Sequence, residues 1–309
     1  MRLVVTAVVA AAVVAATQAP RAAPSTPIIV ELFTSEGCSS CPPADTLLES
    51  LVNSQPISGA QVIGLGLHVD YWDQLGWKDR FSSAALTHRQ QLYGTRFNRQ
   101  SIYTPQMVVD GRAEFVGSDA NAARKAIGRA LDVRHGVVRI AIQPPAADRL
   151  SVSVTASELP RGTGGPSPLI EDHLPGGASR LAALLLPQIP VFSVFAPGHP
   201  GAALRNLVLV QPRRTTSDHG DIVVAITEDH LRSDVKRGEN HGRTLTHAAV
   251  VRHLAAIGEA ANEGATSARA DILLARYWQR EHLNIVAFVQ ERRSRTILAS
   301  AVATLPAVR

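Results

Sequence analysis

The chain has 309 residues, of which 45% are hydrophobic and 18% are charged. This composition is that of a globular protein and excludes an intrinsically disordered one. The formal net charge is +5, and no lysine-rich run or basic–aromatic stretch concentrates it, so the sequence does not predict nucleic-acid binding. The densest basic stretch, "QERRSR" at 290–295, joins two apolar runs and is interpreted as an exposed hairpin turn.

The amino terminus carries a targeting pattern. Arg2 is followed by an apolar stretch of about fourteen residues and then by small residues and prolines, which is the layout of a secretory signal peptide. An uncleaved membrane anchor is the alternative, although a spanning helix needs about 20 apolar residues. We therefore predict a signal peptide over residues 1–26 and an exported protein, periplasmic or secreted, that meets the membrane only through this segment if it stays uncleaved.

From residue 27 the pattern alternates between strands and helices. The expected elements, in chain order, are a strand at 28–33, a helix at 42–52, a strand at 62–69, a helix at 82–97, two strands around Asp110-Gly111 and a helix at 118–131. The Asp-Gly pair between two apolar runs is a strong hairpin signal. The order β-α-β-α-β-β-α, with the first strands parallel, predicts an α/β thioredoxin-like domain over residues 27–133.

The second half of the chain is predicted to be mostly β. Five segments alternate apolar and polar residues, as half-buried strands do: 136–143, 149–156, 221–228, 283–290 and 296–305. They predict a β-rich, sandwich-like domain over residues 136–309, with an irregular Pro/Gly-rich segment at about 160–219. The polar stretch 236–247 is interpreted as a turn between strands. The alternative is a recognition surface formed by Arg237, Asn240, Arg243 and His247.

The two cysteines of the chain, Cys38 and Cys41, lie in "EGCSSCPP" between the first expected strand and helix. In an oxidising compartment two close thiols tend to pair, and a bridge across so short a loop adds little stability. A C-x-x-C at the start of a helix favours the thiolate of its first cysteine. We therefore predict a solvent-accessible redox site with Cys38 as the nucleophile and Cys41, in the first helical turn, as the resolving thiol.

Pro105 opens the third expected strand. Thioredoxin-like folds place a cis-proline there, opposite the C-x-x-C, so its register predicts a cis Thr104–Pro105 bond near the sulfurs. A trans proline at a strand edge is the alternative. With the cis bond, the backbone of Thr104 would hold an incoming substrate chain by strand-like pairing. Trp72 follows the second strand and is expected at the same end of the sheet, where it would contact the substrate.

Two carboxylates are candidates for modulating the sulfurs. Asp70 follows the second strand and either relays a proton or caps its own loop. Glu31 lies within the first strand and is either buried beneath the sulfurs or faces outward. His68, inside the apolar second strand, is interpreted as a hydrogen-bonded core residue.

No metal or cofactor is predicted. Two cysteines supply two of the four ligands of a structural zinc site, no second C-x-x-C is present, and the 11 histidines are scattered. Thiolates suit Cu(I), however, so a copper carrier is one alternative use of Cys38 and Cys41.

Four stretches resemble the secreted family known as domain of unknown function 1223. They are "VELFTSEGCSSCPPAD", "HVDYWDQLGWKDRFSS", "TPQMVVDG" and "SDVKRGENHGRTLTHAAVVRHL", and the resemblance covers most of residues 27–133 and about 221–305. The resemblance implies a thioredoxin-like domain followed by a β-rich one, without a settled activity. Unlike in thioredoxin, no tryptophan precedes Cys38, and Ser39-Ser40 separates the two cysteines.

The predicted function is thiol–disulfide exchange, or redox sensing, through Cys38 and Cys41. The partner would be an exported protein or a small thiol or disulfide. A different class of function is also consistent with the sequence: a non-catalytic binding module in which the disulfide only stiffens its loop.

Overall fold

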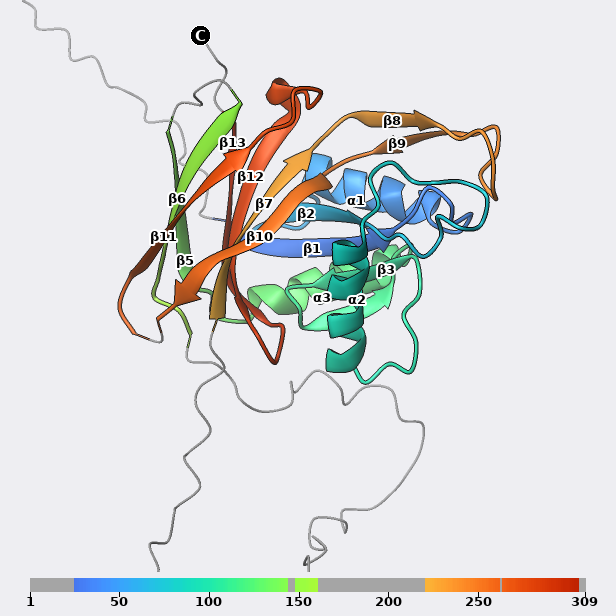
Figure 1. Ribbon diagram of the computed structural model, residues 1–309. Helices are drawn as coiled ribbons and strands as arrows, with labels where there is room; N and C mark the ends of the chain where they lie inside the picture. The colour runs from blue at the N-terminus through green and yellow to red at the C-terminus, as the bar shows by residue number, and fades with distance from the viewer. Residues whose placement is uncertain (1–24, 144–147, 161–219, 262, 306–309) are drawn as a thin grey trace, which may run out of the picture.

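The computed structural model describes residues 25–143, 148–160, 220–261 and 263–305 (Figure 1). The elements are β1 (Thr26–Thr34), α1 (Pro42–Ser54), β2 (Ala60–His68), α2 (Ala84–Arg96), β3 (Gln106–Val109), β4 (Ala113–Val116), α3 (Ala120–Leu131), β5 (Val137–Ile142), β6 (Arg149–Ser157), β7 (Gly220–Glu228), β8 (Leu231–Asp234), β9 (Thr244–His247), β10 (Val250–Ala260), β11 (Thr266–Leu273), the 3-10 helix η2 (Arg280–His282), β12 (Leu283–Glu291) and β13 (Ile297–Thr304). None of the helices in these ranges is long and apolar enough to cross a membrane. The predicted signal peptide and the irregular segment at 160–219 fall almost entirely outside the described residues.

Eight strands form one central sheet in the order β13-β12-β7-β10-β2-β1-β3-β4. The predicted parallel pairing of the first two strands is confirmed, and so is the hairpin of β3 and β4. Its turn residues Asp110 and Gly111 have φ angles of 47° and 64°, which favour Asp and Gly at these positions. The order of the elements from β1 to α3 is the predicted β-α-β-α-β-β-α.

The central sheet continues across the predicted boundary at 133–136. β10 runs parallel to β2 where Val250 lies opposite Gly66, and the Gly66 N–H donates to the carbonyl of Ala249 at 2.7 Å. A side chain at position 66 would meet the backbone oxygens of Ala248 and Ala249 at 3.2 and 3.3 Å. The glycine therefore permits the close approach that joins the two halves of the chain into one sheet.

Helices cover both faces of the sheet around β1. Alternate apolar residues of this strand pack against α1 and α3 on one face and against α2 on the other, as a central strand requires. Side chains cap α2 and α3: the hydroxyl of Ser83 accepts from the N–H of Leu86 at 3.4 Å, and the carboxylate of Asp119 accepts from two N–H groups of the first turn of α3, each at 2.9 Å.

A second, three-stranded sheet has the order β11-β6-β5 and lies at the left of Figure 1. It packs against β7, β12 and β13 through an apolar cluster that includes Val152, Val224 and Ile285. The other face of β7 and β12 joins the apolar cluster beneath α2. The protein is therefore a mixed α/β structure built on one large central sheet.

Four strands, β8, β9, β10 and β11, are not among the segments predicted from the sequence. β10 changes register between Val251 and His253 and again between Ala256 and Gly258, so its apolar residues do not alternate regularly. The five segments predicted as strands in this half are confirmed as β5, β6, β7, β12 and β13. The basic stretch at 290–295 is confirmed as the connection between the antiparallel strands β12 and β13.

Candidate functional site

Cys38 and Cys41 lie between β1 and α1 and form a disulfide, with their Cα atoms 5.4 Å apart. Cys41 caps α1, because its carbonyl accepts hydrogen bonds from the N–H groups of Ala44 at 2.8 Å and Asp45 at 3.1 Å. The helix begins at Pro42, so Cys41 precedes the first turn rather than lying within it as expected. Proline suits this position because the first helical N–H groups have no partner inside the helix.

The Thr104–Pro105 peptide bond is cis and lies directly before β3. Gly117 packs between this loop and α1: its N–H donates to the carbonyl of Pro105 at 2.9 Å, and a Cβ at this position would meet Pro105 and Ala44 at 3.0 and 3.1 Å. The indole N–H of Trp72 donates to the hydroxyl of Thr104 at 2.8 Å. The proline loop and the amino terminus of α1 therefore lie next to each other.

Trp72 also contacts the cysteine loop. A Cβ at Gly37 would lie 3.2 Å from the Cβ of Trp72, so glycine allows the two segments to approach closely. Through this contact and its hydrogen bond to Thr104, Trp72 bridges the cysteine loop and the proline loop. The structure thus brings Cys38, Pro105, Thr104 and Trp72 to one end of the sheet.

A turn from the far end of the chain covers the cysteine loop. It connects β8 to β9 and consists of residues 235–243, which we call the cover. The side-chain amide of Asn240 donates to the carbonyls of Glu36 at 3.0 Å and Cys38 at 2.9 Å. The carboxylate of Glu239 accepts from the N–H of Ser39 at 2.9 Å. Figure 1 shows β8 and β9 extending over α1 at the upper right.

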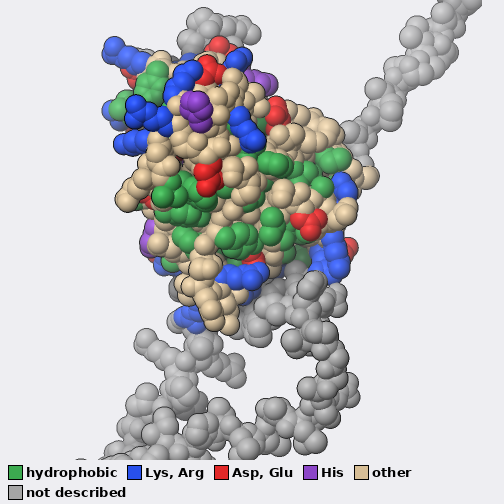
Figure 2. Space-filling model, turned by 90° about the vertical axis from the view of Figure 1, so that its right-hand side faces the viewer, with side chains coloured by type: hydrophobic (Ala, Val, Ile, Leu, Met, Phe, Trp, Pro, Cys, Tyr) green, Lys and Arg blue, Asp and Glu red, His purple; other side chains and the backbone are tan. Residues whose placement is uncertain are grey.

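Both cysteines are 0% exposed, so the predicted solvent access to the sulfurs is wrong for this structure. The cover contributes to this burial, because it contacts the backbone of the cysteine loop through residues about 200 positions away in the chain. Asn240, at the inner side of the cover, is itself fully buried, whereas Lys236, Arg237 and Arg243 are exposed. Figure 2 shows this end of the molecule, with Lys and Arg side chains gathered in its upper part.

The interpretation of 236–247 as a turn between strands is confirmed for residues 236–243, which connect the antiparallel strands β8 and β9, and is wrong for residues 244–247, which form β9 itself. Two of its four candidate recognition residues, Asn240 and His247, are buried within the protein instead of forming an outer surface. Arg243 is exposed and donates to the side-chain oxygen of Asn240 at 3.1 Å.

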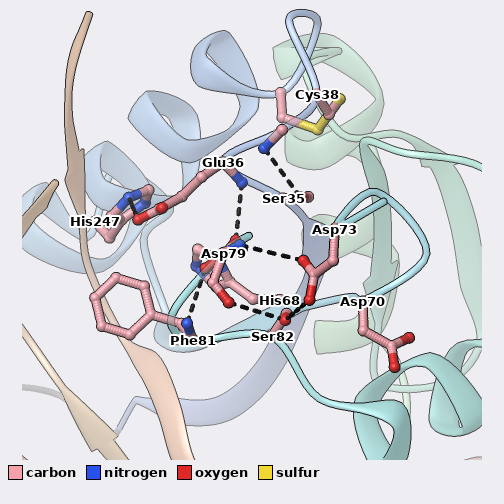
Figure 3. A network of polar contacts seen from close by, with 12 residues as sticks. Ser35, Glu36, Cys38, His68, Asp70, Asp73, Asp79, Phe81, Ser82 and His247 are labelled. Carbon is pink, nitrogen blue, oxygen red and sulfur yellow. Dashed lines mark hydrogen bonds and ion pairs between the residues drawn. A yellow bond between two sulfur atoms is a disulfide. The ribbon is translucent and has the colours of Figure 1, made fainter. Parts of the chain in front are cut away.

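Next to the cysteine loop, four ionisable side chains form a buried cluster (Figure 3): Glu36, His68, Asp79 and His247. One carboxylate oxygen of Asp79 accepts from the N–H of Glu36 at 2.8 Å and lies 2.6 Å from Nδ1 of His68. The Glu36 carboxylate accepts from the indole N–H of Trp77 at 2.7 Å and lies 3.3 Å from Nε2 of His247. Because His247 ends β9, the cluster links the cysteine loop to the strand that carries the cover.

Burial and neighbouring charges shift the pKa values of this cluster in opposite directions. Burial raises the pKa of Asp79, but the positive charge of His68 outweighs it and leaves that pKa below its ordinary value. Burial lowers the pKa of His68, and Asp79 reverses this and raises it. Burial and the charge of Asp79 raise the pKa of Glu36, and its contacts with polar neighbours, foremost His247, lower it on balance. The interpretation of His68 as a hydrogen-bonded core residue is confirmed.

Asp45, in the first turn of α1, is influenced by the same cluster. Burial raises its pKa to about 6, and His247 and His68 act against this shift. A carboxyl with a raised pKa binds its proton more tightly in the folded state, so it stabilises the fold at pH values below its unfolded pKa. This contribution is lost as the pH rises through about 6.

We therefore expect Asp45→Asn to increase the free energy of unfolding by about 2 kcal/mol at pH 8, because the amide cannot ionise. At about pH 4, where the folded protein holds the Asp45 proton, the substitution should have almost no effect. Urea unfolding at the two pH values measures the difference. An equal gain at both would show that packing, and not ionisation, separates the two side chains.

Glu31 is buried, but it does not lie beneath the sulfurs. It points to the face of β1 that carries α2, whereas the cysteine loop continues into α1 on the other face. Its carboxylate accepts from Nε of Arg89 at 2.6 Å and from the hydroxyl of Tyr93. Glu31 is therefore part of an ion pair in the core.

Asp70 anchors its own loop to α2. Its carboxylate accepts from the hydroxyl of Thr87 at 2.5 Å, and its N–H donates to the same oxygen at 3.0 Å. In Figure 3 the carboxylate points away from Cys38. These contacts favour the loop-capping interpretation over the proton relay.

The sequence analysis missed Glu36, Asp45 and Asp79 as members of the site. Glu36 and Asp45 flank the C-x-x-C closely enough to have been considered. Asp79 lies 43 residues from Glu36, and no spacing pattern connects the two. Across the described ranges, no group of three or more His, Cys, Asp or Glu side chains is placed to hold a metal ion.

A family model described as a protein of unknown function, DUF1223, matches residues 29–166 and 199–290. The chain belongs to this family. The matched ranges of the DUF1223 model include the cysteines, Pro105 and the cover. Both sides of the site therefore lie within the family's characteristic sequence.

Solved structures share the fold of this DUF1223 protein. A crystal structure of a protein from Agrobacterium tumefaciens is 21% identical, with a TM-score of 0.58 over 93% of this chain and 98% of that one. HBP35 of Porphyromonas gingivalis is 10% identical, with a TM-score of 0.55 over 92% of this chain and 77% of its own. No curated protein matches the sequence. These identities support a common fold and carry no activity across.

Proposed function

We propose that this DUF1223 protein is an exported thiol–disulfide exchange protein, or a redox-sensitive relative of one, with a thioredoxin-like domain followed by a sandwich-like domain. The observation that carries the proposal is the Cys38–Cys41 disulfide at the amino terminus of α1, beside the cis Thr104–Pro105 bond. The order of elements from β1 to α3 supports the first domain, and the signal-like start of the chain supports export.

The proposed reaction has two steps. A substrate thiolate attacks Sγ of Cys38, the bond between the two cysteines breaks, and Cys41 leaves as a thiolate that the helix amino terminus stabilises. The second thiol of the substrate then displaces Cys38 and forms the substrate disulfide, and the two cysteines become thiols. The reverse sequence oxidises a substrate dithiol. Thr104 and Trp72, which border the site, would position the substrate chain.

A redox titration of the full chain with thiol alkylation tests this proposal. We expect a reduction potential within the range of exchange proteins, roughly −120 to −270 mV. A potential below about −300 mV, with no catalysis of disulfide reduction, would identify an inert structural bridge.

Single substitutions assign the two sulfurs. Cys41→Ser should accumulate mixed disulfides through Cys38, because the resolving thiol is gone, and Cys38→Ser should form none. Mass spectrometry after incubation with a model disulfide measures the adducts. Adducts on Cys41 in the Cys38→Ser variant, together with no adducts on Cys38 in the Cys41→Ser variant, would reverse the assignment of nucleophile and resolving thiol.

The burial of both cysteines favours a second candidate, a binding module in which the disulfide only stiffens its loop. The double variant Cys38→Ser/Cys41→Ser separates the two candidates. An exchange protein loses its activity in this variant, whereas a binding module keeps its partner.

A further inference from the structure

We propose that the cover is a gate: residues 235–243 must leave the cysteine loop before thiol exchange can begin, and Asn240 and Glu239 hold the gate closed. The inference rests on the proposed function, since it concerns access to the same disulfide. The geometry requires some opening, because a thiolate must approach Sγ of Cys38 in line with the bond to Cys41, and both residues are 0% exposed.

The cover is attached to the protein in a way that allows it to move. In the described part of the chain, β8 and β9 pair with each other as a separate two-stranded sheet and not with the central sheet. His230 lies directly before this hairpin and Ala249 lies shortly after it. Their φ angles are 58° and 53°, so the backbone turns abruptly at both ends. Displacing the cover therefore breaks no hydrogen bond of the central sheet.

The cover is also compact enough to move as a unit. Its two ends are joined by hydrogen bonds from the N–H of Val235 to the carbonyl of Arg243 and from the N–H of Gly242 to the carbonyl of Val235, both at 2.9 Å. Gly238, at the tip, packs against the opposite loop, where a Cβ would meet the Cβ of Trp77 at 3.2 Å. The tip of the cover therefore packs closely against the loop that contains Leu75 and Trp77.

The latch consists of three hydrogen bonds that cross from the cover to the cysteine loop. Asn240 donates two, at 3.0 and 2.9 Å, and its amide is fully buried; Glu239 accepts the third, at 2.9 Å, at the surface. The Ser39 side chain and N–H lower the pKa of Glu239, so it is a carboxylate when it accepts. An opened cover exchanges these three bonds for bonds to water. The base of the hairpin is held separately, by the contact between His247 and Glu36 and by the hydrogen bond from Arg80 to the carbonyl of Arg232 at 2.6 Å.

The experiment measures how fast dithiothreitol reduces the oxidised full chain. One dithiothreitol thiolate attacks Cys38 and releases Cys41, and its second thiol displaces Cys38, so the reagent becomes a cyclic disulfide and both cysteines become thiols. We expect Asn240→Ala to be reduced at least about tenfold faster than the wild type and Glu239→Ala several-fold faster, because each substitution removes part of the latch. Acid quenching, alkylation and mass spectrometry give the rate.

Matched controls lie on the same turn. Arg237→Ala and His241→Ala change exposed side chains of the cover and leave Asn240 and Glu239 in place, so they should leave the rate unchanged. Circular dichroism and the urea midpoint show whether Asn240→Ala is folded. If it is not folded, the reduction rates of Glu239→Ala and of the more conservative Glu239→Gln, both at an exposed position, test the proposal instead.

The gate is overturned if folded Asn240→Ala and Glu239→Ala are reduced at the wild-type rate. It is also overturned if the two controls accelerate reduction as much as the latch variants do. A faster reduction of the latch variants together with a potential below about −300 mV keeps the gate and rejects exchange as the function. The two proposals therefore fail in different measurements.

Discussion

Replacing Arg89 with methionine is expected to lower the free energy of unfolding by about 3–5 kcal/mol, because it leaves the carboxylate of Glu31 buried without its positive partner. Glu31 is 0% exposed, and Nε of Arg89 donates to it at 2.6 Å. Burial alone would lower the pKa of Arg89, but Glu31 reverses this and raises it, so the guanidinium is charged in the folded protein. Methionine fills a similar volume, so the loss measures the charge rather than a cavity.

The matched control removes both charges. In Glu31→Gln/Arg89→Met no unpaired charge remains, so most of the lost stability should return. Urea unfolding of the wild type, the two single variants and the double variant completes the cycle. A double variant as unstable as Arg89→Met would show that the arginine contributes through packing against Tyr93 and Phe288, above whose rings its guanidinium lies at 5.5 and 5.6 Å.

The same ion pair connects the two halves of the chain. Arg89 also donates to the side-chain oxygen of Gln290 on β12 at 2.9 Å, and Gln290 donates to the hydroxyl of Tyr93 at 2.8 Å. α2, β1 and β12 therefore share one buried polar network. Arg89→Met should weaken the attachment of β12 as well as the helix.

Local patterns in the sequence were sufficient to predict the secondary structure of the first half. Each predicted element there depends on neighbours within a few residues: the alternation in β1, the caps at Ser83 and Asp119, and the Asp110-Gly111 turn. The junction of β10 with β2 could not be predicted in the same way. It depends on one pair, Val250 opposite Gly66, that no periodicity reveals.

In the candidate site, too, the local features were predictable from the sequence and the long-range contacts were not. Cys38, Cys41 and the cis bond before Pro105 were predicted from one motif and one register, and Trp72 from the end of a strand. The burial of both cysteines was not predicted, because the turn that contacts their loop lies about 200 positions away in the chain. Asn240 lies in a polar turn, and nothing in the sequence of that turn indicates that its amide points inward.

Asp110 and Gly111 form the second junction between the halves. The Asp110 carboxylate accepts from the N–H of Ile29 at 2.8 Å and lies 2.9 Å from Nε2 of His135, and its carbonyl accepts from the N–H of Ile297 on β13 at 2.9 Å. The turn thereby links β1, the segment after α3 and the last strand. Gly111 lies so close to the backbone of Arg295, just before β13, that a larger residue would not fit.

Gly111→Ala should therefore cost about 3 kcal/mol or more. The new Cβ would overlap the carbonyl oxygen of Arg295, and a φ of 64° disfavours any L side chain. Gly128→Ala is the matched control, because nothing lies within 4 Å of its Cβ and the residue is inside α3, where alanine should add about 0.5–1 kcal/mol. Urea unfolding of both variants gives the comparison. If Gly111→Ala lost less than about 1 kcal/mol, the hairpin could shift away from β13 without consequence, and it would not hold the two halves of the sheet together.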